Sequence, residues 1–247
     1  MQDALAIPEG TPLSQVERVV DTFVAPRKTF TDILRNTNCW LPLLLMVLLT
    51  VGWTYTIDKK IGFAAISEQQ ITKSPKAEET MQQLPPDKRA SRMAMTTSIT
   101  RGTTYASFLF VVIFIALEAL LLWGSFNFGL GAQTRFSQVF AVVVYAGLPR
   151  YLIWILSAIL VLAGVGTDNF DLRNPVGTNL GYFLTDSPQW LTSGAQFFDV
   201  LGLWSLALLV IGMAVIARKT IAQSATVVIG WWVVILVIVV GFTAAFS

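Results

Sequence analysis

The sequence contains no histidine and only one cysteine, Cys39. A single cysteine cannot form an intrachain disulfide. Without histidine, and with one thiol, the chain also lacks the ligands of most zinc, haem and iron-sulfur sites and any histidine acid or base. We therefore predict that the protein is not an enzyme and that it holds no cofactor and no metal.

Charged residues are scarce as well, since they make up 13% of the 247 residues, whereas hydrophobic residues make up 54%. The mean hydropathy of +0.64 is typical of membrane proteins rather than of soluble domains. The net charge is only +2, and no large basic block occurs in the chain. Nucleic acid is therefore not an expected partner, whereas the lipid bilayer is.

Several long stretches have no charge and suit transmembrane helices, because about 20 apolar residues cross the roughly 30 Å hydrocarbon core of a bilayer. Five spans are predicted, at residues 40–57, 104–126, 136–165, 195–217 and 224–246. The expected fold is an all-α polytopic bundle, with an N-terminal segment of residues 1–38 and a membrane domain of residues 39–247. The polar, proline-containing stretch 58–103 predicts a solvated loop with short helical pieces on its flanks.

The segment from Leu13 to Leu34 predicts two short amphipathic helices separated at Pro26. Their apolar residues are Leu13, Val16, Val20, Phe23 and Val24 in the first helix, and Phe30, Ile33 and Leu34 in the second. In one interpretation both helices lie in the plane of the bilayer, with their stripes in shallow contact with lipid. Four basic residues would then lie near anionic headgroups, namely Arg18, Arg27, Lys28 and Arg35. In the other interpretation the same stripes pack on the membrane bundle.

Three charged residues, Glu118, Arg150 and Asp199, lie within or beside the apolar spans. Ionisable residues in a membrane are candidates for function, although three charges on three helices can also lock a bundle together. Glu118 and Arg150 are expected to face each other inside the bundle, because they lie about 14 and 21 Å from the turn that joins their helices. Gly147 and Pro149 predict a kink in the third span.

The distribution of charge suggests an orientation. An odd number of spans places the termini on opposite sides, and a cytoplasmic N-terminus puts Arg135, Arg218 and Lys219 inside, in agreement with the positive-inside rule. The loop 58–103, which carries eight Lys or Arg residues, would then lie outside, contrary to that rule. We expect the N-terminus to be cytoplasmic and the C-terminus to be outside.

Four segments of the chain form a characteristic pattern, namely RVVDTFVAPRKTFTDIL, then FNFGLGAQTRFSQVFAVVVYAGLPRYL, then NPVGTNLGYFL before DVLGLWSLALLVIG. This pattern resembles the Yip1-domain membrane proteins. The resemblance implies five spans with a cytoplasmic N-terminus. Eukaryotic members are similar to adaptors that bind small GTPases, but this chain lacks their acidic-Leu-Tyr-Gly-Pro motif and has no tyrosine before Tyr55, which argues against that partner.

The short N-terminal region looks more like that of bacterial members, which implies the bacterial cytoplasmic membrane. We therefore expect a non-enzymatic scaffold or adaptor that acts through contacts with other membrane proteins or with copies of itself. The alternative is a transporter or channel subunit that uses Glu118, Arg150 and Asp199.

Overall fold

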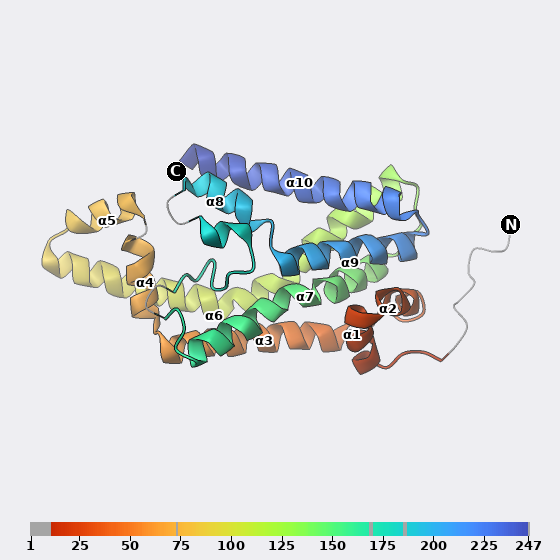
Figure 1. Cartoon of the computed structure of the whole chain (residues 1–247), viewed down its shortest axis with the longest axis horizontal. Coiled ribbons are helices and arrows are strands. Elements are labelled where there is room, and N and C mark those ends of the chain that lie inside the picture. Colours follow the sequence, from red (N-terminus) through yellow and green to blue (C-terminus); the bar gives the residue numbers. More distant parts are fainter. Residues whose placement is uncertain (1–10, 73, 168–169, 185–186, 247) are drawn as a thin grey trace. The chain divides into compact units, whose positions relative to one another are not determined.

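The computed structural model of the protein describes residues 11–72, 74–167, 170–184 and 187–246. These residues form helices and connecting loops and contain no β-strand (Figure 1). The α-helices are α1 (Gln15–Val24), α2 (Pro26–Ile33), α3 (Trp40–Lys60), α4 (Phe63–Thr72), α5 (Pro75–Gln82), α6 (Pro86–Gly124), α7 (Phe136–Leu162), α8 (Gln189–Gln196), α9 (Val200–Ala217) and α10 (Ile221–Phe246). A π-helical turn, η1 (Ser125–Gly129), and a 3₁₀ turn, η2 (Leu180–Phe183), complete the list.

Five of these helices are long and apolar enough to cross a membrane: α3, α6 with η1, α7, α9 and α10. Each of them overlaps one of the predicted spans, so the predicted all-α polytopic fold is confirmed. The fourth span begins later than predicted, at Val200 instead of residue 195, because a separate short helix, α8, precedes it. The predicted division at residue 38 stays a prediction.

The prediction of a solvated loop at residues 58–103 is wrong. Helices α4 and α5 cover much of this stretch, and α6 begins at Pro86, far before the predicted start at residue 104. Proline is tolerated in the first turn of a helix, where its missing amide would have no partner in any case. The side chain of Arg89 then donates to three carbonyl oxygens at the end of α5, those of Met81, Gln82 and Leu84, over 3.0 to 3.3 Å.

The chain divides into two compact units. Unit 1 comprises Met1–Met46, Val112–Leu152 and Thr178–Ser247, and unit 2 comprises Val47–Val111 and Ile153–Gly177. In unit 1, the first half of α7 forms the centre of the core, with every residue from 141 to 146 buried. Helices α9 and α10 lie side by side, α2 packs against α9, and α1 packs against α2 (Figure 1).

The core of unit 2 is built around a pair of tryptophans. The rings of Trp53 and Trp154 have their centres 4.2 Å apart, and the indole nitrogen of Trp53 donates to the Ser157 hydroxyl over 2.8 Å. The other buried members of this core are Ile57, Phe63, Ile66, Val161 and Phe170. An indole inside an apolar core needs a partner for its N–H group, and Ser157 provides one.

Candidate functional site

The N-terminal helix pair α1–α2 has the most elaborate polar site in the described part of the chain. Helix α1 begins with a capping box, in which the Glu17 amide donates to the Ser14 hydroxyl and the Ser14 amide donates to the Glu17 carboxylate. These hydrogen bonds from Ser14 lower the pKa of Glu17. The box satisfies two of the amides that the first turn of a helix leaves without partners, and so it fixes where α1 starts.

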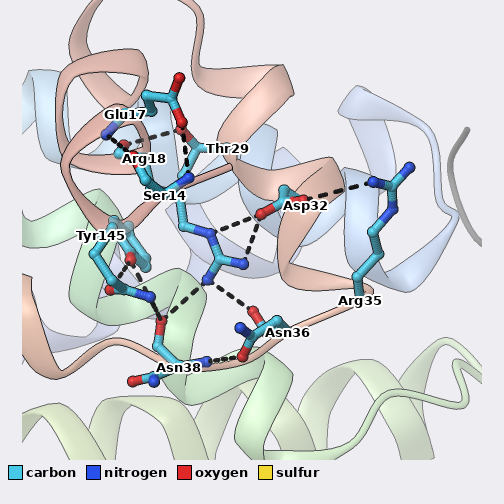
Figure 2. A network of polar contacts seen from close by, with 10 residues as sticks. Ser14, Glu17, Arg18, Thr29, Asp32, Arg35, Asn36, Asn38 and Tyr145 are labelled. Carbon is cyan, nitrogen blue, oxygen red and sulfur yellow. Dashed lines mark hydrogen bonds and ion pairs between the residues drawn. The ribbon is translucent and has the colours of Figure 1, made fainter. Parts of the chain in front are cut away.

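Arg18 is the centre of the site and is completely buried. Its Nε and Nη2 atoms lie 2.7 and 2.6 Å from Oδ2 of Asp32 in α2. Its Nη1 atom donates to the backbone oxygens of Asn36 and Asn38, over 2.8 and 3.1 Å, in the segment that leads into α3. Figure 2 shows the guanidinium pointing at all three groups at once. One side chain therefore ties α1 to α2 and to the start of the first span.

The backbone of Arg18 is used as well. Its carbonyl oxygen accepts from the hydroxyls of Thr22 and Thr29, which come from α1 and α2 and are both buried. The network reaches α7 through Tyr145, whose hydroxyl lies 2.9 Å from Oε1 of Gln15 and 3.4 Å from the backbone oxygen of Asn38 (Figure 2). The helix pair is thus clamped to the core of unit 1 by polar contacts.

This arrangement suits a structural clamp better than a reaction centre. A buried charge is tolerated where it is paired, and Arg18 is paired with Asp32 and donates hydrogen bonds from its Nε and Nη1 atoms to three oxygen atoms. The residues that the structure describes include no group of Cys, Asp or Glu side chains placed to hold a metal ion. The site consequently has a positioning role, because it fixes the rotation of α1 about its own axis.

The outer face of α1 is apolar. Val16, Val20 and Val24, one turn apart, are exposed over 64%, 53% and 73% of their surface. Helix α2 has the opposite arrangement, since its apolar residues Phe30 and Ile33 are fully buried. The expected shallow lipid contact of both stripes is therefore wrong for α2, which packs on the bundle instead.

The four basic residues predicted at the membrane surface also differ from one another. Arg18 is fully buried against Asp32, so its assignment to the surface is wrong, because its polar partners lie inside the protein. Arg35 is also largely covered, and its side chain lies 4.0 Å from Asp32. Arg27 and Lys28 are exposed, and Lys28 forms an ion pair with Asp21 at 2.9 Å. Headgroup contact stays a proposal for these two residues.

The three charges predicted to form an intramembrane cluster do not all come together. Asp199 is the N-cap of α9, where its carboxylate accepts from the amide of Gly202 over 2.7 Å and from the hydroxyl of Thr178. Glu118 is half-buried in α6, and Arg150 is exposed on α7 rather than turned into the bundle. Arg150 acts electrostatically on Glu118, but in the described residues no ion pair joins them.

Pro149 lies inside α7, which continues as a helix to Leu162. A methyl group added at Gly147 would stand 3.4 Å from the Met46 side chain, so this glycine marks a close approach of α3 to α7 within unit 1. The predicted kink at Gly147 and Pro149 stays a prediction.

Unit 2 carries a second candidate surface, on the part of α6 that precedes the span. Lys88, Arg92, Met95 and Ile99 are all exposed and follow one another at intervals of three or four residues. At roughly 100° per residue they lie within a narrow strip on one face of the helix. We call these four residues the arm stripe.

Sequence reasoning missed the Arg18–Asp32 pair and the arm stripe for different reasons. Arg18 and Asp32 are 14 residues apart on two helices, and no local pattern shows that they meet. A signal was nevertheless present, because Arg18 and Thr22 share the face of α1 opposite the valines. The arm stripe was missed because the three prolines between residues 75 and 86 suggested a loop.

A comparison with protein families supports the pattern described above. The model of the Yip1 domain matches residues 20–242, which is nearly the whole chain. No curated protein and no solved structure matches the chain.

Proposed function

Because the chain belongs to the Yip1-domain family, we propose that it acts as a non-enzymatic membrane scaffold or adaptor through protein contacts at the membrane. It is an integral membrane protein, with five helices suited to spanning the bilayer. The proposed protein contact is made by the arm stripe, and the clamped helix pair α1–α2 lies at the bilayer.

The observation that carries this proposal is the length of α6. Its 39 residues extend about 58 Å, nearly twice the roughly 30 Å thickness of the hydrocarbon core. The first part of the helix must therefore project into water. Asp58 fastens the base of this arm within unit 2, since it pairs with Arg101 at 3.0 Å and accepts from the Tyr105 hydroxyl at 2.9 Å.

The chemistry of the arm stripe indicates the kind of partner. Two cations precede two large apolar side chains, so a complementary surface would present carboxylates beside an apolar patch. We propose another membrane protein with such a surface as the partner, and a second copy of this chain is the alternative that the test distinguishes. A rigid helix is well suited to this role, because little conformational entropy is lost when it binds.

The transporter alternative has less support. Its three charges are Glu118, Arg150 and Asp199, and Asp199 is engaged in capping α9 through Gly202. Glu118 and Arg150 remain two charges near each other without a third. A scaffold needs no path for a solute, whereas a transporter needs polar groups aligned across the bilayer.

The orientation proposed from the sequence places the N-terminus in the cytoplasm and the arm outside a bacterial cytoplasmic membrane. Single cysteines at positions 88 and 219, in a Cys39→Ser background, test this placement. An impermeant maleimide added to intact cells should label position 88 and not position 219. Labelling of both positions from outside would refute the orientation.

The adaptor proposal is tested by photo-crosslinking in native membranes. A photoreactive residue at Met95 or Ile99 should give a discrete crosslinked protein, and Lys88→Glu with Arg92→Glu should remove at least nine-tenths of it. Ala90 is the matched control, because it is exposed on the opposite side of the same helix. The size and peptide content of the product distinguish a different protein from a second copy.

Equal crosslinking from Met95 and Ala90 would contradict a specific contact. Solute flux through purified, reconstituted protein, together with no crosslinked product from the stripe, would favour the transporter alternative instead.

A further inference from the structure

We propose that the outer face of α1, formed by Val16, Val20 and Val24, is a lipid-contact surface that lies at the level of the acyl chains. This surface would touch acyl chains, and the charged side of the same helix would touch headgroups and water. The proposal is independent of the arm stripe, which belongs to unit 2.

The residues of α1 fall into three groups around the helix axis. At roughly 100° per residue, the three valines cover one side of the helix, and Arg18 and Thr22 lie nearly opposite them. Glu17 and Asp21 lie between these two sides. The inner side is fully buried and hydrogen-bonded within the protein.

The intermediate side marks the direction of water. Glu17 is exposed, and Asp21 binds Lys28 at 2.9 Å. Lys28 has its pKa raised, first by the hydrogen bond and the charge of Asp21. Charged groups of this kind need water or headgroups, so they mark the edge of the proposed lipid-contact surface.

The depth of the helix pair follows from its contacts with α9. This span has 18 residues and extends about 27 Å, close to the thickness of the hydrocarbon core, so its whole length is needed to cross. Phe30 packs against Gly212, and the rings of Phe23 and Trp204 have their centres 5.6 Å apart. Gly212 and Trp204 both lie inside that span, eight residues or about 12 Å apart along it, so the contacts of α1 and α2 lie at the level of the acyl chains.

Lipid fits this surface better than a second protein does. Three valine side chains offer far less than the roughly 800 Å² per partner that a stable protein interface buries. At the depth of α9, the medium around an exposed apolar face is hydrocarbon. The polar inner face and apolar outer face of α1 are the arrangement that a helix needs between a protein and lipid.

The test uses single cysteines at Val20 and Glu17 in a Cys39→Ala background, each carrying an environment-sensitive fluorophore. The protein is reconstituted in vesicles of phosphatidylcholine and phosphatidylglycerol, with or without brominated acyl chains. We expect brominated lipid to quench the label at position 20 at least threefold more than the label at position 17. Aqueous iodide should show the reverse preference.

A label at Val24 provides a second site on the same face and guards against a local effect of the Val20 substitution. Equal access of iodide to positions 17, 20 and 24 would overturn the proposal, because the face would then lie in water. A label at positions 20 and 24 that neither quencher reaches would also overturn it, since a protein would then cover the face.

Discussion

Helices α1 and α2 follow each other with one residue between them, and both are amphipathic, yet they face the protein in opposite ways. Helix α1 buries Arg18 and Thr22 and exposes its valines, whereas α2 buries Phe30 and Ile33. Asp32 and Thr29 are the polar groups of α2 that turn inward with the apolar residues, and both meet Arg18. The direction of α1 is therefore set by the Arg18–Asp32 ion pair together with the hydrogen bonds of Arg18.

The comparison teaches that amphipathicity defines two faces without saying which one the protein covers. In water the apolar face of a surface helix turns inward, because burial removes apolar area from solvent. Next to lipid that driving force is absent, and hydrogen bonds and ion pairs decide the orientation instead. The orientation of α1 is the one expected next to lipid, whereas α2 has the packing expected of a surface helix in water.

The largest effect on the packing of α1 is expected from removing Asp32, the partner of Arg18 in α2. Asp32→Ala leaves the Arg18 charge buried without its partner, and the expected loss is about 3–5 kcal/mol of unfolding free energy. Thermal unfolding of the detergent-solubilised protein measures it. The double variant Arg18→Met with Asp32→Leu should lose much less unfolding free energy than the sum of the losses in Arg18→Met alone and Asp32→Leu alone. Additive losses would show that the pair does not set the packing of α1.

A smaller effect is expected from disturbing the packing of α2. A methyl group at Gly212 would stand 2.5 Å from Val142 and 3.0 Å from the Phe30 ring. Gly212→Ala should therefore displace Val142 of α7 and Phe30 of α2 from α9 and lower the unfolding free energy by about 1–3 kcal/mol. Gly230→Ala is the matched control in α10, because no atom lies within 4 Å of its added methyl, and it should be nearly neutral. Equal stability of both variants would contradict the close packing of α2.

The smallest effect concerns pH and the residue that follows the clamped segment. Burial raises the pKa of the Cys39 thiol to about 11, and the charge of Arg18 opposes part of this rise. An acid whose pKa is raised by folding stabilises the protein below its unfolded pKa and loses this contribution as pH rises toward the folded value. Stability should thus fall between about pH 9 and 11, and by less in Cys39→Ala, as measured by melting temperature. Identical pH profiles would mean that Cys39 is not buried as a neutral thiol.

Much of the fold follows from composition, because the apolar stretches that become α3, α7, α9 and α10 can satisfy their backbone in a bilayer only as helices. The start of α6 could not be found in this way. Prolines at residues 75, 85 and 86 predict breaks between helices, yet Pro86 opens α6 at its first turn. A proline is tolerated in the first turn of a helix but breaks or kinks a helix in its interior, so its position relative to the helix end decides its effect.

The candidate site was less predictable than the fold. The sequence identifies Arg18 as polar and α1 as amphipathic, but the partner of Arg18 depends on how α2 folds back. Asp199 was grouped with Glu118 and Arg150 because all three are charged and lie near spans. Its position directly before Val200 makes it a helix N-cap, a role that needs only the local backbone.

Val20 of α1 and Ile33 of α2 have opposite environments, since they are exposed over 53% and 0% of their surface. Spin labels at these two positions, in a Cys39→Ala background and in lipid vesicles, measure this difference through collisions with oxygen and with a water-soluble nickel complex. We predict that the label at position 20 is mobile and reached by oxygen more than by nickel, while the label at position 33 is immobile and reached by neither. Equal lipid exposure of the two labels, or water exposure at position 20, would contradict the account.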